Sequence, residues 1–167
     1  MDRLKPVDGL IKDLAEALTA TLQARDIRDP AMIGIHTGGV WVAERLHRHL
    51  GLSLPLGTLD ISFYRDDFTR VGVNPHVRPS RLPFEVEGRD IVLVDDVLYT
   101  GRTIRAALNE IFDYGRPNRV LLAVLVDRGQ RELPIAADAC ALRMELPTDE
   151  EIKLKGPEPL SLIVQSS

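Results

Sequence analysis

The chain has 167 residues, of which 44% are hydrophobic and 28% are charged, and its net charge at pH 7 is -4. This length suits one hydrophobic core, so we expect residues 1–167 to form a single domain. Since no apolar run approaches the ~20 residues that cross a bilayer and the first residues are polar, neither a membrane helix nor a signal peptide is expected. Cys140 is the only cysteine, which excludes an intrachain disulfide and fits a reducing, cytoplasmic compartment.

The first expected element is an amphipathic helix near the beginning of the chain. Its apolar side chains recur at about every fourth position and so share one helix face, which we expect to pack into the core. The members of this stripe are Leu10, Ile11, Leu14, Leu18 and Leu22.

A short strand over residues 32–35 then leads into a second helix that is predicted to end at Gly51. Thr37, Gly38 and Gly39 lie between the two elements. Paired glycines at such a junction let the backbone approach an anion closely, and the amide groups at the beginning of a helix favour negative charge. An anion-binding loop and a tight turn without a ligand both fit this segment.

Residues 56–64 are predicted to form a second strand region, and the chain from there to Pro83 shows no clear helical or strand period. A loop of this length in a compact domain is usually functional or disordered. A lid over a bound ligand and a solvated hairpin with scattered charges are the two interpretations. The cationic side chains of this segment are those of Arg65, Arg70, Arg78 and Arg81.

The most informative segment is residues 91–103. It opens with four apolar residues without alternation, which predicts a parallel strand buried on both faces. Asp95 and Asp96 follow at the carboxyl end, where ligands bind in open α/β sheets. The Thr-Gly-Arg-Thr run that ends the segment stands just before a predicted helix, whose first amide groups would face an anion. These residues predict a phosphorylated-sugar site; the alternative is a strand that ends at a turn with Thr103 as a helix N-cap.

A further apolar run over residues 120–126 predicts another central strand, and Asp127 and Arg128 follow it. The order helix, strand, helix, strand, loop, strand, helix, strand predicts an α/β fold with a mainly parallel sheet flanked by helices. At the end of this strand the exposed backbone can bind a ligand, or Asp127 and Arg128 can simply pair at a turn.

Residues 91–103 resemble the 5-phosphoribosyl-1-diphosphate (PRPP) signature of the type I phosphoribosyltransferases. Residues 60–67 and 124–135 are similar to segments of the PyrR family, the bifunctional pyrimidine operon regulators and uracil phosphoribosyltransferases; the similarity runs from about Gly34 to Pro134. The resemblance implies the type I phosphoribosyltransferase fold with a flexible lid, conversion of uracil and PRPP into UMP and diphosphate, Mg²⁺ as cofactor, and a homodimer or higher homo-oligomer.

The resemblance also assigns a role to each motif. Asp95 and Asp96 would be catalytic and hold the ribose hydroxyls directly or through a Mg²⁺ shell, and Arg65 would assist catalysis. The other implied roles are PRPP binding by Thr37, Gly38, Gly39, Val97, Leu98, Tyr99, Thr100, Gly101, Arg102 and Thr103, uracil binding by Val126, Asp127 and Arg128, and lid contacts by Arg70, Arg78 and Arg81.

Three positions depart from the patterns of these families. Purine salvage members carry an acid where Tyr99 stands, so Tyr99 argues against a purine substrate. Gly38 replaces the arginine usual in PyrR relatives, which predicts weaker PRPP binding or more reliance on Mg²⁺ and backbone donors. An arginine introduced at position 38 is predicted to tighten PRPP binding if the backbone angles there tolerate a side chain. Gln130 replaces a histidine, and no functional consequence follows from that change.

The resemblance names an alternative or additional function, an mRNA-binding regulator of pyrimidine biosynthesis that responds to UMP or PRPP. RNA affinity depends heavily on basic surface, whereas this chain is acidic overall. The first helix and the tail place acids among their few basic residues, and Ala136 and Ala137 stand where basic residues are expected in RNA-binding relatives. Charge placement therefore does not favour mRNA as a partner.

Overall fold

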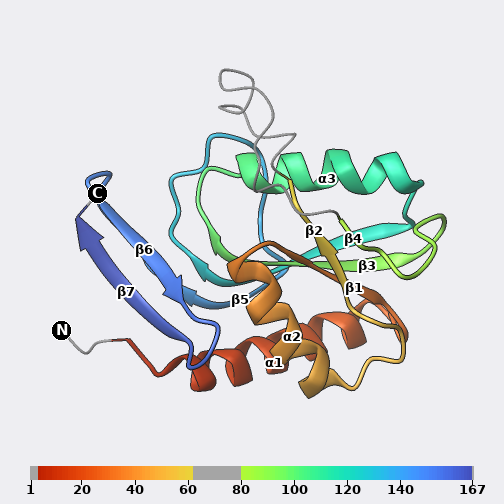
Figure 1. Ribbon diagram of the computed structural model, residues 1–167, viewed down its shortest axis with the longest axis horizontal. Coiled ribbons are helices and arrows are strands. Elements are labelled where there is room, and N and C mark those ends of the chain that lie inside the picture. Colours follow the sequence, from red (N-terminus) through yellow and green to blue (C-terminus); the bar gives the residue numbers. More distant parts are fainter. Residues whose placement is uncertain (1–3, 62–79, 167) are drawn as a thin grey trace.

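The computed structural model describes residues 4–61 and 80–166 (Figure 1). The expectations for Arg65, Arg70 and Arg78 lie outside these residues. The elements in chain order are α1 (Val7–Ala24), β1 (Ala31–Ile35), α2 (Gly38–Leu50), β2 (Gly57–Leu59), β3 (Asp90–Leu98), α3 (Arg102–Tyr114), β4 (Arg119–Asp127), β5 (Ala139–Arg143), β6 (Glu150–Lys155) and β7 (Ser161–Ser166).

Five strands form one parallel sheet in the order β2-β1-β3-β4-β5. In the centre of the sheet Leu93 pairs with Ile33 on one side and with Leu122 on the other. The mainly parallel sheet predicted from the unbroken apolar runs is thus confirmed.

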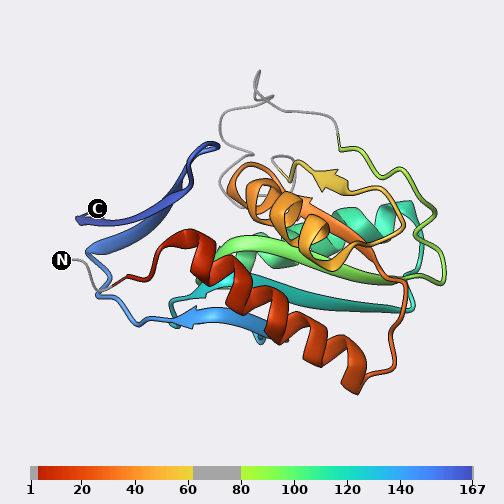
Figure 2. The same ribbon diagram turned by 90° about the horizontal axis from the view of Figure 1, so that it is seen from below.

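Helices cover both faces of this sheet: α1 and α2 lie on one face and α3 lies on the other (Figures 1 and 2). Successive residues of a strand point to opposite faces. In β3 the side chains of Val92 and Val94 therefore pack with α1 and α2, while those of Ile91 and Leu93 pack with α3. Because both faces are dry, the strand needs apolar residues at every position.

The first two helices match their predictions. All five members of the α1 stripe are buried. Helix α2 ends at Leu50 with Gly51 as its C-cap, and the φ of 60° at Gly51 is left-handed and favours glycine. None of the helices in the described parts of the chain is long and apolar enough to cross a membrane.

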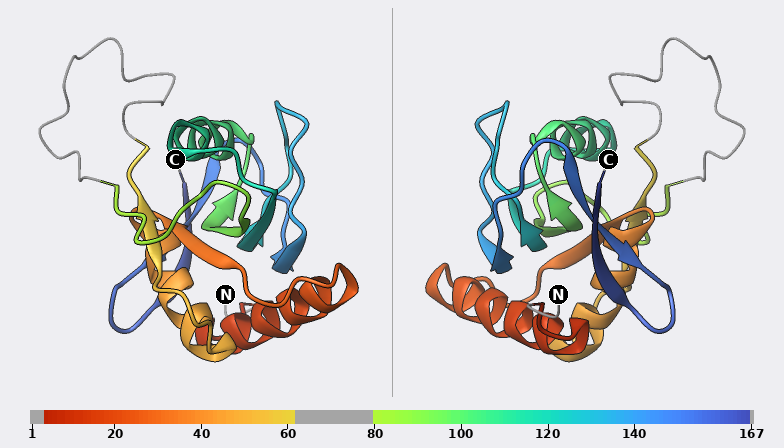
Figure 3. Two further views of the ribbon diagram at one scale, coloured as in Figure 1. Left: turned by 90° about the vertical axis from the view of Figure 1, so that its right-hand side faces the viewer. Right: turned by 90° about the vertical axis from the view of Figure 1, so that its left-hand side faces the viewer.

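The strands after β4 were not predicted, and two predicted strand ends differ. Among the described residues of the predicted 56–64 region, β2 covers three, and residues 62–64 lie outside the described ranges. Strand β3 continues through Leu98, so Asp95 and Asp96 lie within its last part rather than after it. Strands β6 and β7 form a separate antiparallel hairpin at one end of the main sheet (Figures 1 and 3). Only Ile152 and Leu154 of β6 are buried, and such short apolar alternation among charged residues is a weak strand signal.

Candidate functional site

The acid pair occupies the carboxyl part of β3. The Asp95 residue is only 6% exposed, and Asp96 is half-buried. Asp95 Oδ1 accepts a hydrogen bond from the Asp96 amide at 2.9 Å, and Asp96 Oδ1 accepts one from the Val97 amide at 2.8 Å. These bonds hold both carboxylates against the backbone at the sheet edge.

The loop before α2 lies directly against this acid pair. A Cβ at Gly39 would be 2.8 Å from the Val94 carbonyl oxygen, and a Cβ at Gly38 would overlap the Asp96 carboxylate. Only glycine permits so close an approach. This close approach brings the glycine loop and the acid pair, which are distant in sequence, into contact at one edge of the sheet. The peptide bond between His36 and Thr37 in the same loop is cis.

The loop after β3 leads into α3. Helix α3 begins at Arg102, and its N-cap is Gly101 with a left-handed φ of 95°. The Thr100 hydroxyl accepts a hydrogen bond from the Arg102 amide at 3.2 Å. The interpretation of Thr103 as the N-cap is wrong, because that residue already lies in the first turn of the helix. The amide groups at the beginning of α3 provide a favourable place for an anion.

The loop after β4 lies beside the loop after β3, since the Arg128 amide donates to the Leu98 carbonyl at 3.0 Å. Asp127 pairs with Arg131 and not with Arg128. The interpretation in which Asp127 and Arg128 simply pair with each other at a turn is therefore wrong. Backbone groups at the end of β4 thus come close to the segment that follows the acid pair.

The Arg128 side chain is buried, with 4% of the residue exposed. Its guanidinium carbon lies 3.9 Å from the centroid of the Tyr99 ring, a cation–π contact. Nη1 donates to the Glu150 carbonyl at 3.0 Å and Nη2 to the Pro147 carbonyl at 3.2 Å, while Nε has no hydrogen-bond partner among the described residues. Arg128 therefore connects the β6–β7 hairpin to the edge of the main sheet, and contact between its side chain and a base stays a prediction.

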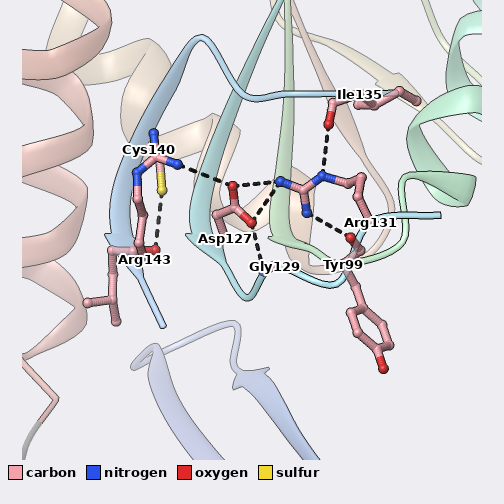
Figure 4. Close-up of polar contacts among 8 residues, drawn as sticks. Tyr99, Asp127, Gly129, Arg131, Ile135, Cys140 and Arg143 are labelled. Carbon is pink, nitrogen blue, oxygen red and sulfur yellow. Dashed lines mark hydrogen bonds and ion pairs between the residues drawn. The ribbon is translucent and has the colours of Figure 1, made fainter. Parts of the chain in front are cut away.

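Asp127 is 6% exposed and is surrounded by donors (Figure 4). Burial by itself raises the pKa of Asp127. Hydrogen bonds from Arg131 and from the Gly129 amide, with the positive charges of Arg131 and Arg143, outweigh burial and hold the pKa of this carboxyl below its usual value. Asp127 is therefore a charged group inside the protein at neutral pH.

Of the arginines predicted to make lid contacts, Arg81 lies among the residues that the structure describes. Its amide and carbonyl each form a 2.8 Å hydrogen bond with Thr58, in an antiparallel bridge beside β2, and the residue is exposed. Within the described ranges, no group of three or more His, Cys, Asp or Glu side chains converges to hold a metal ion. Two carboxylates at a sheet edge fit Mg²⁺, which takes most of its ligands from water and substrate oxygens.

Arg131 is the residue that the sequence interpretation missed. Its side chain reaches the carbonyl of Tyr99, the carboxylate of Asp127 and the carbonyl of Ile135. Residues 131–135, Arg-Glu-Leu-Pro-Ile, belong to the segment 124–135 that carries the family resemblance, and the sequence assigned them no role. The only signal in the sequence was that Arg131 stands four residues after Asp127. Its two carbonyl partners give no signal in the sequence.

Comparisons with known proteins agree with this geometry. The phosphoribosyl transferase domain family matches residues 2–157. Among solved structures, a purine phosphoribosyltransferase from Pyrococcus horikoshii is 28% identical with a TM-score of 0.61 and covers 83% of each chain. A hypoxanthine-guanine phosphoribosyltransferase from Bacillus anthracis, with 15% identity over 87% of this chain and 82% of its own, shares the fold with a TM-score of 0.67.

Curated relatives give a narrower family. The bifunctional protein PyrR of Nitrosococcus oceani is 58% identical over 161 residues, which is 95% of this chain and 91% of the relative. The bifunctional protein PyrR of Pseudomonas aeruginosa strain PAO1 is 59% identical over 153 residues, 92% of this chain and 90% of the relative. The chain therefore belongs to the phosphoribosyl transferase domain family and, within it, to the PyrR family.

Proposed function

We propose that this protein is a uracil phosphoribosyltransferase, which joins uracil N1 to C1 of PRPP and releases diphosphate. One observation carries the proposal: in a chain of the PyrR family, the acid pair, the glycine loop before α2 and the loop before α3 meet at the carboxyl edge of the sheet. Sugar hydroxyls need acceptors and phosphates need backbone donors, and this edge has both.

The proposed roles follow the geometry. Asp95 and Asp96 accept from the ribose hydroxyls, residues 97–103 bind the 5-phosphate, and residues 37–39 approach the diphosphate. A bound Mg²⁺ would neutralise charge on the departing diphosphate, with the acid pair near it. The backbone of residues 126–128 offers donors and acceptors that match the alternating carbonyl and N–H groups of uracil.

Catalysis in this proposal is mainly electrostatic. Bond cleavage at C1 leaves positive charge on the ribose, and the two carboxylates lie on the same side as its hydroxyls. Water must be kept from this carbon, and closure of the segment that contains Arg65, Arg70, Arg78 and Arg81 is the predicted means. A cytoplasmic location and a homo-oligomeric state are further predictions.

A product assay with a panel of bases tests the proposed reaction. With PRPP and Mg²⁺ present, we expect kcat/KM for uracil to exceed that for cytosine, hypoxanthine or guanine by at least ~100-fold, because unmatched polar groups in a site are costly. Products are identified by chromatography against UMP, CMP, IMP and GMP standards. A purine nucleotide as the main product would contradict the assignment to uracil.

A second candidate function comes from the relatives, which are named bifunctional. The corresponding candidate for this chain is binding of the leader mRNA of a pyrimidine operon. The charged surface of α1 does not support tight binding. Lys5 just before the helix pairs with Asp13 at 2.7 Å, and the C-cap residue Arg25 pairs with Asp138 at 2.8 Å, so the cations at both ends of α1 already have acidic partners.

We therefore expect no sequence-specific complex with the leader RNA at nanomolar protein concentration. Non-specific binding by comparable DNA-binding proteins has dissociation constants of only ~10⁻⁴ to 10⁻⁶ M, and interspersed acids weaken it further. Fluorescence anisotropy with the host's leader RNA and a scrambled control at about 0.15 M salt, with and without UMP, measures the affinity. A nanomolar complex that UMP strengthens and scrambling removes would establish the regulator instead.

A further inference from the structure

Residues 129–135 fold back along the loop that follows β3, and we call this segment the brace. The Thr100 carbonyl accepts hydrogen bonds from the amides of Glu132 at 2.9 Å and Leu133 at 3.1 Å. A Cβ at Gly101 would lie 3.4 Å from both Leu133 Cβ and Ile135 Cβ. The brace is therefore packed against the loop that is proposed to bind the 5-phosphate.

A tight turn at the beginning of the brace returns the chain toward β4. Gly129 and Gln130 both have left-handed φ values, 76° and 59°. This conformation is uncommon for a residue with a side chain, so neighbouring contacts must stabilise it. The turn places the Arg131 side chain beside Asp127, the last residue of β4, within 2.8 Å of its carboxylate.

The Arg131 guanidinium joins three segments (Figure 4). Nη2 donates to Asp127 Oδ1 at 2.9 Å and to Oδ2 at 2.8 Å. Nη1 donates to the Tyr99 carbonyl at 2.7 Å, and Nε donates to the Ile135 carbonyl at 2.8 Å. A lysine cannot replace this fork, because its single ammonium group lacks the planar set of donors.

We propose that Arg131 is a positioning residue, which fixes the spacing between the loop for the sugar phosphate and the base-binding end of β4. The inference rests on the proposed function. Tyr99 belongs to the first of these two segments and Asp127 to the second, so one side chain holds both. Since a displacement of about 1 Å can cost ~100-fold in rate, the loss of this link must reduce catalysis without direct contact between Arg131 and the substrates.

The charge of Asp127 is part of this arrangement. Its carboxylate accepts from Arg131 and from the Gly129 amide at 2.9 Å, so protonation would weaken both contacts. The pKa of Asp127 is held low in the folded protein. Both contacts are therefore kept above that pKa and lost as the pH falls through it. Without Arg131, Arg143 at 3.6 Å is the remaining cation beside Asp127, the pKa of this carboxyl rises, and its contact with the Gly129 amide is lost at a higher pH.

The test compares Arg131→Met with Arg131→Lys and with Arg28→Gln. Arg131→Met should lower kcat/KM ~100-fold with higher KM values for both PRPP and uracil, and the acid limb of its pH profile should move to higher pH. Arg131→Lys retains one cation and should lie between this variant and the wild type. Arg28→Gln removes an exposed pair with Asp26 before β1, with side chains that are 89% and 82% exposed, and should leave all constants within ~2-fold.

Amide hydrogen exchange separates this inference from the proposed reaction, because it needs no substrate. In Arg131→Met, or in Arg131→Lys if the first variant does not fold, exchange should increase in residues 98–103 and remain unchanged in α1. The role of Arg131 would be overturned if a folded variant, with either lysine or methionine at position 131, had both the kinetic constants and the exchange rates of the wild type. If the wild type makes no UMP but the exchange result holds, the positioning of the loop stands and the proposed reaction fails.

Discussion

Replacement of both Asp95 and Asp96 by asparagine is expected to abolish UMP formation from uracil and PRPP while the chain remains folded. The amide oxygens can still accept hydrogen bonds, but both negative charges are lost where positive charge develops on the ribose. The loss of one such electrostatic partner costs ~10² to 10³ in rate, so the double change should lower kcat/KM by at least ~10³-fold. Conversion of labelled uracil measures the activity, and circular dichroism with thermal melting measures the fold.

Asp90→Asn is the matched control, because Asp90 is an acid at the other end of the same strand. It pairs with Arg119, Oδ1 to Nε at 3.0 Å, and the hydrogen bond from Arg119 is the largest cause that keeps the pKa of Asp90 below its usual value. This change should cost some stability and leave kcat/KM within ~2-fold, since a partly exposed pair contributes little. Full activity in a folded Asp95→Asn, Asp96→Asn protein would contradict the ribose assignment.

The sequence interpretation succeeded where apolar residues follow a long, regular pattern. The stripe of α1 repeats at helical spacing and so predicts a helix with one buried face. The unbroken run of β3 is short and rich in β-branched residues, which favours a strand buried on both faces over a helix. The glycines at positions 38, 39 and 101 were also informative, because each marks a close approach or a left-handed turn that a side chain would disturb.

It failed where the partners of a side chain are distant backbone groups. The base-binding role of Arg128 stays a prediction, but the sequence did not indicate that its Nη atoms bind the carbonyls of Pro147 and Glu150, in a segment whose strands were not predicted. Arg131 was overlooked for the same reason, since two of its three partner residues contribute carbonyl oxygens. Every residue has a carbonyl group, so no sequence pattern identifies which of them an arginine will reach.

Gly38→Ala is expected to raise the KM for PRPP ~10-fold, a change of about 1.4 kcal/mol, with little change in melting temperature. The φ of Gly38 is not left-handed, so its backbone tolerates a side chain, but the added Cβ would overlap the Asp96 carboxylate. The carboxylate must then turn away from its present position beside the Val97 amide. This contact revises the sequence-based expectation that an arginine at position 38 would bind PRPP more tightly than the wild type does.

Gly38→Arg separates the effect of volume from that of charge. It introduces the same Cβ and adds donors for the diphosphate, so its KM for PRPP should fall between those of the wild type and Gly38→Ala. Gly9→Ala in α1 is the matched control, because its Cβ would meet only Lys5 side-chain atoms at an ordinary 3.6 Å, and its KM should equal that of the wild type. A wild-type KM in Gly38→Ala would show that the position of the Asp96 carboxylate does not matter for PRPP. An arginine variant that binds more tightly than the wild type would show that charge outweighs the displacement of Asp96.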